Sequence, residues 1–291
     1  MRVMITGARG QLGSALMRSA PQEAVTLGLA RADCDIGDAA AVQRQLDAFQ
    51  PTLLINAAAY TAVDRAEEER AAAMAANASA PGLLAEVCAA RGVRFFHVST
   101  DFVFDGRRST PYPPEAATAP LGVYGETKLA GERAVQSAST DALIMRTGWV
   151  YAMRGHNFLR TMLRLHRERD ELAVVADQVG TPTRDLSLAS ALWAAAERSG
   201  LSGLYHWSDA GVCSWYDFAQ AIGEEAEALG LLQRAAAVRP LRSIDYPTPA
   251  TRPAYSVLDK TRSWADLQIT PVHWRVQLRA TLKAIKEHED G

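Results

Sequence analysis

The chain has 291 residues, 48% of them hydrophobic and 22% charged, which is ordinary for a globular protein with a full core. Its 31 basic and 33 acidic residues give a formal net charge of −2, so neither a nucleic-acid partner nor a membrane partner is expected. Three widely spaced cysteines predict a reducing, cytoplasmic compartment. We expect no signal peptide and no membrane-spanning helix, because the N-terminal pattern is not that of a signal peptide and no apolar run reaches the roughly 18–20 residues that cross a bilayer.

Short apolar segments alternate with helical segments through the first half of the chain. Strands are predicted over residues 2–6, 24–29, 52–56, 93–98 and 142–146. Helices are predicted over 11–19, 39–49, 66–91 and 123–137, the third of them broken near Pro81 and Gly82. Continuous apolar strands between helices are typical of a parallel sheet that is covered on both faces, so the sequence predicts a doubly wound α/β fold of the Rossmann type.

The alternation weakens beyond Tyr151. There the pattern predicts helices over 157–169, 186–199, 215–229 and 276–287, a strand over 172–175 and an irregular proline-rich stretch over 239–255. We therefore expect an NAD(P)-binding Rossmann domain over 1–150 and a smaller, mainly substrate-binding lobe over 151–291. The helix near 186–199 is expected to return to the first domain.

Three glycines follow the first predicted strand and open the first helix. Gly7, Gly10 and Gly13 are spaced G-x-x-G-x-x-G, with Arg9, Gln11 and Leu12 between them. One glycine lets the chain turn sharply after the strand, another lets the backbone approach a pyrophosphate, and a third lets helix and strand pack closely. In this context of strand, loop and helix, the segment is predicted to bind a dinucleotide.

The end of the second predicted strand bears on the choice of cofactor. No carboxylate stands there for the 2′-hydroxyl of NADH, and Arg31 can either hold a 2′-phosphate or remain a solvated loop charge. The sequence therefore favours NADPH modestly over NADH. Asp35 and Ile36 are candidates to flank the adenine. The small residues Ala57, Ala58 and Ala59 either lie against the nucleotide or serve helix–sheet packing.

Tyr124 and Lys128 stand four residues apart, which places a phenol and an ammonium on one face of a helix. The chain has 8 tyrosines and only 4 lysines, so such a pair is rare by chance. A free tyrosine has a pKa of about 10, and a nearby cation favours the phenolate and lowers that pKa. The pair therefore indicates a general acid tuned toward neutral pH.

A hydroxyl is expected beside that pair. Ser99, Thr100 and Asp101 follow the predicted 93–98 strand, and ligands of an open parallel sheet bind at the carboxyl ends of its strands. A threonine there can bind the oxygen that Tyr124 protonates, although a lone hydroxyl after a strand more often caps a loop. His97, within the strand, fits a hydrogen-bonded strand residue better than a metal ligand.

The glycine loop, this hydroxyl and the Tyr-x-x-x-Lys pair together resemble the extended short-chain dehydrogenases/reductases. Within that superfamily the chain is similar to the dTDP-4-dehydrorhamnose reductase family over nearly its whole length. The segments that carry the resemblance are 5–13 (ITGARGQLG), 56–64 (NAAAYTAVD), 99–106 (STDFVFDG), 123–132 (VYGETKLAGE), 146–151 (RTGWVY), 157–158 (NF), 177–183 (DQVGTPT) and 246–253 (YPTPATRP).

The resemblance implies that NADPH or NADH reduces the C4 ketone of dTDP-4-dehydro-β-L-rhamnose. Tyr124 would protonate the developing alkoxide, Lys128 would hold the nicotinamide ribose and tune Tyr124, and Thr100 would hydrogen-bond the reacting oxygen. Besides the glycine loop, Tyr124 and Lys128, the implied cofactor contacts are Ala59, Tyr60, Thr61 and Val98. The implied sugar-nucleotide contacts are Thr100, Asp101, Phe102, Trp149 and Asn157.

Some positions depart from the family pattern. Phe102 stands where the family often has tyrosine, and Gly148 where serine is usual. Some relatives bind Mg²⁺ at a dimer interface through acidic side chains, one of them near the first helix. Ser14 and Ala15 occupy that stretch here, which disfavours the Mg²⁺ site without excluding the ion, and we assign no metal ligands. A homodimer is compatible with the resemblance, and the sequence does not determine it.

The same fold also carries other functions. A sugar-nucleotide 4,6-dehydratase needs a further acid–base pair after the threonine, and Phe102 cannot move a proton, so that activity is disfavoured. A reductase of a related dTDP-4-keto-deoxyhexose stays open, because the shape of the pocket reads the stereochemistry of the hydroxyls. A catalytically idle relative that acts as a regulatory subunit also stays open, although the intact Thr100, Tyr124 and Lys128 argue against it.

Overall fold

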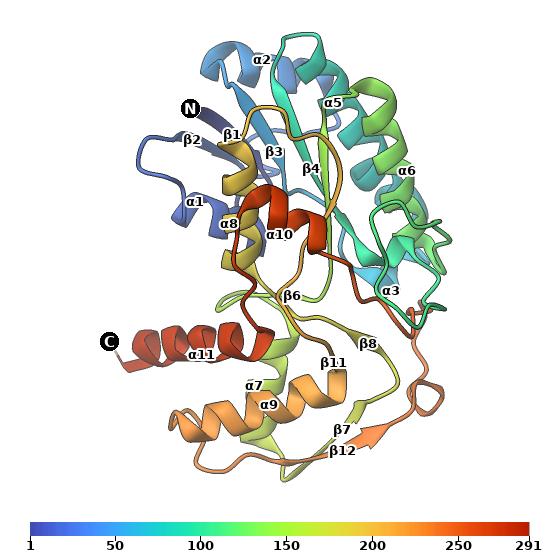
Figure 1. Ribbon diagram of the computed structural model, residues 1–291, viewed down its shortest axis with the longest axis vertical. Coiled ribbons are helices and arrows are strands. Elements are labelled where there is room, and N and C mark those ends of the chain that lie inside the picture. The colour runs from blue at the N-terminus through green and yellow to red at the C-terminus, as the bar shows by residue number, and fades with distance from the viewer. Residues whose placement is uncertain (291) are drawn as a thin grey trace.

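Within residues 1–290, which the computed structural model describes, a six-stranded parallel sheet forms the upper part of the molecule (Figure 1). The strand order is β2-β1-β3-β4-β5-β10, and neighbouring strands run parallel. The strands are β1 (Arg2–Thr6), β2 (Val25–Leu29), β3 (Leu53–Asn56), β4 (Arg94–Thr100), β5 (Leu143–Thr147) and β10 (Gly203–His206). The prediction of a doubly wound α/β fold is confirmed.

Helices cover both faces of this sheet, because successive strand residues point to opposite sides. Val3 and Ile5 of β1 pack in one core cluster with α1 (Gln11–Arg18) and α8 (Asp185–Ala196), to which α10 (Thr261–Leu267) contributes Leu267. Met4 packs in another with α2 (Ala39–Phe49), α5 (Ala80–Ala89) and α6 (Val123–Ala138). Burial on both faces explains why the strands are continuous apolar runs in the sequence.

The observed elements differ from the predicted ones in several respects, and the stretch predicted as irregular over 239–255 contains the end of β12 (Ala237–Leu241) and a 3₁₀ turn, η3 (Ser243–Asp245). The predicted 66–91 helix is not broken at Pro81; after α3 (Val63–Ala66), α4 (Arg70–Met74) continues through a π-helical turn, η1 (Ala75–Ser79), into α5. Pro81 lies in the first turn of α5, where the wide turn accommodates a ring without an N–H. Strand β4 continues to Thr100, and β10 was not predicted at all.

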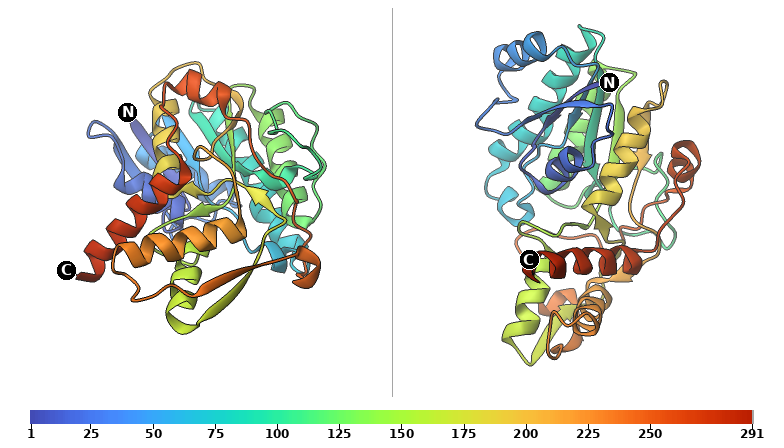
Figure 2. Two further views of the ribbon diagram at one scale, coloured as in Figure 1. Left: turned by 60° about the horizontal axis from the view of Figure 1, so that its bottom comes forward. Right: turned by 90° about the vertical axis from the view of Figure 1, so that its left-hand side faces the viewer.

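A smaller lobe lies below the sheet (Figures 1 and 2). It contains α7 (Phe158–Glu168), α9 (Trp215–Ala228), α11 (Trp274–Asp290) and the short strands β6 (Val150–Tyr151), β7 (Glu171–Val175), β8 (Val179–Gly180), β9 (Thr183–Arg184), β11 (Cys213–Ser214) and β12 (Ala237–Leu241). Leu163, Phe218 and Leu278 share its core. Among the described residues, no helix combines the length and the apolar character that a membrane span requires.

Candidate active site

The carboxyl end of β4 and the start of α6 meet at one edge of the sheet. Thr100 ends β4, and Asp101 begins a 3₁₀ turn, η2 (Asp101–Val103). Tyr124 lies in the first turn of α6, and its ring makes an edge-to-face contact with Phe102 at 5.5 Å between centroids. The Thr100 hydroxyl donates to Asp101 Oδ1 at 3.1 Å, accepts from the N–H of Phe102 at 3.2 Å, and lies close enough to the phenol of Tyr124 to lower its pKa. The structure therefore brings together the predicted threonine and tyrosine.

Tyr124 holds its proton firmly in this environment. Burial raises its pKa to about 12, and the hydrogen bond with Thr100 offsets only part of that rise. The expectation that a neighbouring cation lowers this pKa is wrong, because burial outweighs every contact that favours the phenolate. A protonated phenol is the form that a proton donor needs.

Lys128 lies one turn after Tyr124 and is 2% exposed. Its ammonium nitrogen lies 2.7 Å from the carbonyl oxygen of Val98, to which it donates. Burial lowers its pKa to about 8, although the carboxylate of Glu132 acts in the opposite direction. Glu132 is itself engaged by Arg146 through two hydrogen bonds of 2.8 and 2.6 Å. Lys128 can therefore change its protonation state near neutral pH.

Lys128 also ends a chain of buried polar groups that sequence reasoning missed. Its Nζ lies 3.4 Å from Nε2 of His97, and Nδ1 of His97 lies 3.1 Å from Nδ2 of Asn56. Oδ1 of Asn56 accepts from Thr6 Oγ1 at 2.6 Å and from the backbone N–H of Ala58 at 3.2 Å. His97 is a hydrogen-bonded strand residue, as predicted. The available signal was Asn56 at the end of the apolar strand β3 and His97 among the apolar residues of β4.

Asn77, in the π-helical turn η1, is a second residue that the sequence did not single out. Its Oδ1 accepts from the backbone N–H of Tyr60 at 2.8 Å, and its Nδ2 donates to the carbonyl of Tyr60 at 3.0 Å and to Thr127 Oγ1 at 3.1 Å. Asn77 thereby fixes the loop after β3 against α6. Tyr60 packs in one small apolar cluster with Tyr124, and the neighbouring Thr61 is exposed.

The glycine loop fits a phosphate at the start of α1. A Cβ on Gly7, whose φ is +70°, would lie 2.7 Å from the nitrogen of Ala58, and one on Gly13 would overlap the carbonyl of Gly7. Gly10 is exposed, and a Cβ there would meet only the Gly7 oxygen at 3.2 Å. Gly10 caps α1 without a side-chain hydrogen bond, and the first turn has no acidic residue. Unpaired N–H groups at such a helix start attract an anion, so these residues fit a dinucleotide pyrophosphate.

The remaining predicted cofactor residues surround this loop. A backbone hydrogen bond of 3.1 Å joins the loop to the end of β2. Arg9 and Arg31 are exposed, so both guanidinium groups are accessible to a 2′-phosphate. Asp35 is exposed and accepts from a backbone N–H of its own turn at 2.9 Å, whereas Ile36 is half-buried against the sheet core.

Asp101 lies directly opposite Gly148. Its carboxyl is buried, and burial raises its pKa to about 6, although hydrogen bonds from Ser256 and Thr100 lower it in part. A Cβ on Gly148 would come within 2.5 Å of this carboxyl group. The glycine at a position where serine was expected therefore leaves room for Asp101.

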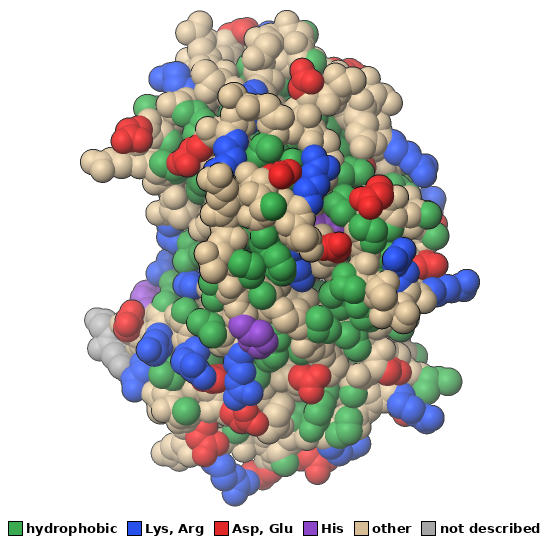
Figure 3. All heavy atoms as spheres, in the orientation of Figure 1, with side chains coloured by type: hydrophobic (Ala, Val, Ile, Leu, Met, Phe, Trp, Pro, Cys, Tyr) green, Lys and Arg blue, Asp and Glu red, His purple; other side chains and the backbone are tan. Residues whose placement is uncertain are grey.

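Trp149 lies where the chain passes from the sheet into the lower lobe. Its φ is +52°, and its ring stacks on Trp215 with 3.5 Å between centroids. Gly180 permits this placement, because a Cβ there would lie 2.6 Å from the indole. A non-glycine residue held at positive φ by its surroundings is typical of a functional site. On the face shown in Figure 3, hydrophobic side chains gather across the middle of the molecule.

Asn157 is placed at the start of α7. Its Oδ1 accepts from the backbone N–H of Arg160 at 3.0 Å, and its Nδ2 donates to Gln11 Oε1 at 2.9 Å and to the carbonyl of Ala152 at 3.0 Å. The structure thus brings Asn157 to the glycine loop, through Gln11. Its contact with a sugar nucleotide stays a prediction.

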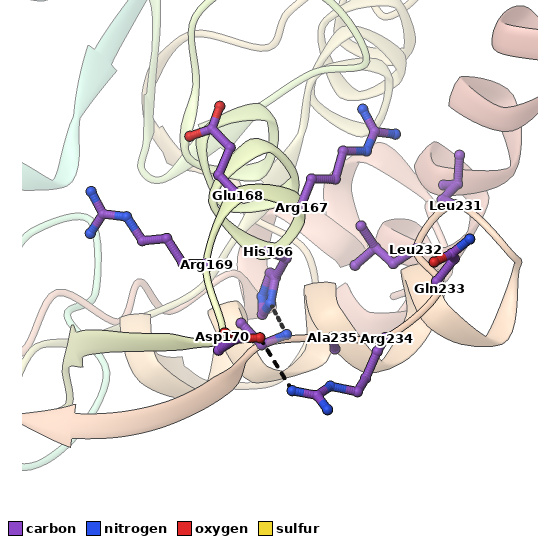
Figure 4. A pocket seen from close by; sticks show the side chains of 11 residues that line it. His166, Arg167, Glu168, Arg169, Asp170, Leu231, Leu232, Gln233, Arg234 and Ala235 are labelled. Atoms are coloured by element: carbon purple, nitrogen blue, oxygen red, sulfur yellow. Dashed lines mark hydrogen bonds and ion pairs between the residues drawn. The ribbon is translucent and has the colours of Figure 1, made fainter.

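A separate hollow of about 430 Å³ lies in the lower lobe, between the end of α7 and residues 231–236 (Figure 4). His166 lies within it, and both ring nitrogens are engaged: Nδ1 accepts from the N–H of Ala236 at 3.2 Å, and Nε2 donates to the carbonyl of Ala219 at 3.1 Å. Arg234 and Asp170 pair at its rim. None of the predicted site residues lines this hollow, so it is distinct from the candidate active site.

Comparison with known proteins agrees with this geometry. Residues 1–287 match the family model described as the RmlD substrate binding domain. The chain is 42% identical over 285 residues to the dTDP-4-dehydrorhamnose reductase of Burkholderia thailandensis, covering 94% of this chain and 96% of that protein. It is 43% identical over 290 residues to that of Mycobacterium tuberculosis, covering 97% and 93%. It matches the crystal structure of dTDP-4-dehydrorhamnose reductase from Bacillus anthracis in complex with NADP with a TM-score of 0.92 and 34% identity, over 97% of this chain and 99% of that chain.

Proposed function

The chain belongs to the RmlD substrate-binding-domain family, and from this membership we propose that it reduces the C4 ketone of dTDP-4-dehydro-β-L-rhamnose to dTDP-β-L-rhamnose, the last step of dTDP-L-rhamnose biosynthesis. The protein is an oxidoreductase that uses NADPH or NADH. The observation that carries the proposal is the meeting of Thr100, Tyr124 and Lys128 beside a glycine loop that fits a dinucleotide.

We assign the proton donor to Tyr124. When bound, the reduced nicotinamide supplies a hydride to the carbonyl carbon of the sugar. Tyr124 gives its phenolic proton to the carbonyl oxygen, so that one C–H and one O–H bond form and the ketone becomes an alcohol. The pKa of about 12 keeps that proton on Tyr124 until the oxygen becomes basic. Thr100 hydrogen-bonds the same oxygen and fixes its position.

Lys128 is assigned to the cofactor in this proposal. As an ammonium it would donate hydrogen bonds to the hydroxyls of the nicotinamide ribose. Its place one helical turn from Tyr124 supports this role. Because its pKa is lowered to about 8, the charged form is available at neutral pH and is lost at higher pH.

The cofactor and substrate contacts are assigned to opposite sides of the three catalytic residues. On the cofactor side, the N–H groups of Gln11 and Leu12 bind the pyrophosphate, Gly10 lets the backbone approach it, and Arg31 with Arg9 favours NADPH. Asp35 and Ile36 flank the adenine, and the nicotinamide side is lined by Ala57, Ala58, Ala59, Tyr60, Thr61 and Val98. The sugar nucleotide contacts Asp101, Phe102 and Trp149 of the first domain and Asn157 of the 151–291 lobe, which is mainly substrate-binding. Three free, buried cysteines support a reducing, cytoplasmic setting.

An assay with the natural substrate class tests the proposal. The purified protein is mixed with dTDP-4-dehydro-β-L-rhamnose made in situ, nicotinamide absorbance is followed with NADPH and NADH in parallel, and the product sugar is identified. We expect oxidation of the cofactor, dTDP-L-rhamnose as the product, and a faster reaction with NADPH.

Two other outcomes would redirect the assignment. No turnover with either cofactor, from protein that is folded by circular dichroism, contradicts the proposed substrate, and other dTDP-4-keto-deoxyhexoses are then tested. Failure with all of them would favour a regulatory subunit. A clear preference for NADH would remove the role given to Arg31 and leave the reaction unchanged.

A further inference from the structure

The contacts of His97 determine which of its nitrogens carries a proton. The backbone N–H of Ala58 can only donate, so the Asn56 atom 3.2 Å away is the amide oxygen. The NH₂ end of that amide therefore faces Nδ1 of His97 at 3.1 Å and donates to it. Because Nδ1 accepts, the single proton of a neutral imidazole lies on Nε2. The imidazole is neutral, since burial holds its pKa well below the usual value, and any charge on Lys128 would act in the same direction.

The proton on Nε2 faces Lys128. Nζ of Lys128 lies 3.4 Å from Nε2, and an ammonium has three donors and no acceptor. If Lys128 were charged, an N–H of its ammonium would therefore face the Nε2–H of His97, and both groups are donors. The neutral amine has a lone pair that accepts from Nε2–H, while one of its own hydrogens is donated to Val98 O at 2.7 Å. The contact consequently favours the uncharged form, in the same direction as burial.

The surrounding charged groups do not reverse this preference of Lys128 for the uncharged amine. Glu132 raises the pKa of Lys128, but its carboxylate is already shared with Arg146. Asp101 acts on Tyr124, which is protonated, and its own pKa is raised to about 6. Thr6 can donate or accept through its hydroxyl, so the orientation of Asn56 is set by Ala58 and not by Thr6.

We propose that His97 is a positioning residue that disfavours the ammonium form of Lys128, so that binding of the cofactor draws one proton from solvent onto Lys128. The inference rests on the proposed function, in which the ribose contact uses the ammonium. It also gives the loop after β3 a second role. The backbone of Ala58, predicted to lie against the nucleotide, fixes the amide of Asn56 and thereby the proton of His97.

The first test is spectroscopic and is read on the wild-type protein. Two-bond ¹H–¹⁵N spectra of histidine-labelled protein, recorded without nucleotide between pH 6 and 8, report the tautomer of each ring, and His97 is assigned as the signal lost in His97→Gln. We expect a neutral ring with its proton on Nε2 throughout this range. A proton on Nδ1, or a charged imidazolium, overturns the proposal.

The second test measures proton uptake. NADPH is titrated calorimetrically into the protein at pH 8, in buffers of different ionisation enthalpy. A lysine with a pKa of about 8 that becomes fully charged takes up about half a proton per site. In His97→Gln, the amide oxygen can accept from the ammonium, the pKa rises by about one unit, and uptake falls to about a tenth of a proton.

Thr6→Val serves as the matched control. It removes a hydrogen bond from the same buried chain but leaves the N–H of Ala58 to orient Asn56, so uptake should equal that of the wild type. Equal uptake in wild type and His97→Gln, or an equal fall in Thr6→Val, overturns the proposal. If neither NADPH nor NADH binds the wild type, the proposed function fails, and the spectra still decide the tautomer of His97.

Discussion

Tyr124 is the residue on which the proposed chemistry depends most directly. Tyr124→Phe removes the proton donor and keeps the ring that packs on Phe102. We expect kcat to fall by roughly 10²–10⁴-fold, while the melting temperature and the affinity for NADPH change little. Steady-state kinetics, thermal unfolding and NADPH titration measure these quantities.

Tyr205→Phe is the control for the loss of a tyrosine hydroxyl. Its hydroxyl donates to Asp266 at 2.9 Å and lies outside the candidate site, so this variant should keep its activity. A Tyr124→Phe protein with near-normal turnover would assign the proton to another group.

The distance along the chain between contacting residues explains how far sequence patterns could predict the site. The pairing of Tyr124 with Lys128 depends on a spacing of four along one helix, which a sequence displays directly. His97 contacts Asn56, which lies 41 positions before it, and Lys128, which lies 31 positions after it. Only the folded sheet brings these residues together. The high pKa of Tyr124 was missed for the same reason, because burial is a property of the fold and not of the spacing.

At the scale of elements, the start of α6 positions Tyr124. The N-cap residue Gly122 has no side chain to cap the helix, and the carboxylate of Glu67 instead accepts from the N–H of Val123 at 2.9 Å. Glu67→Ala should lower the free energy of unfolding by about 1 kcal/mol, and a displaced first turn should lower kcat by about tenfold. Urea denaturation and steady-state kinetics measure the two effects.

Glu68→Ala is the matched control for that variant. Glu68 is the next residue along the chain, is exposed and belongs to the same turn, so its loss should change the free energy of unfolding by less than about 0.5 kcal/mol. Equal behaviour of the two variants would mean that the carboxylate of Glu67 does not hold α6 in place.

The strands that the sequence predicted well include those that are buried almost throughout. β3 is buried at every position and β1 at every position but its first, so their apolar pattern does not depend on one partner. β10 escaped prediction because it has four residues, begins at a glycine and is specified mainly by its pairing with β5. Pro81 suggested a break in the helix, but the π-helical turn before it absorbs the missing N–H.

At the scale of the whole molecule, segments from the second half complete the edge of the sheet where the candidate site lies. α8 packs on α1, which begins at the glycine loop. The 246–256 stretch returns to α3, which follows the loop after β3. There Arg252 pairs with Asp64 through two contacts of 3.0 and 2.8 Å, and the stretch leads on to Ser256, which hydrogen-bonds Asp101. The sequence could not predict this return, because the pattern of that stretch is irregular and its partners lie 188 positions away.

The pair formed by Arg252 and Asp64 is therefore expected to act on substrate binding more than on stability. Both side chains are partly exposed, at 25% and 39%, so Arg252→Gln should change the free energy of unfolding by less than about 1 kcal/mol. The loosened stretch should raise the KM for the sugar nucleotide by about threefold to tenfold, with kcat and NADPH affinity nearly unchanged. Arg252 lowers the pKa of Asp64, so the pair is intact at neutral pH and is lost only as pH falls through that lowered pKa.

Arg242→Gln is the matched control, because Arg242 pairs with Asp245 within its own turn. An equal rise in KM in both variants would show that the stretch is not held through Asp64, whereas a rise confined to Arg252→Gln would establish the connection between the cofactor-side loop and the sugar-binding side.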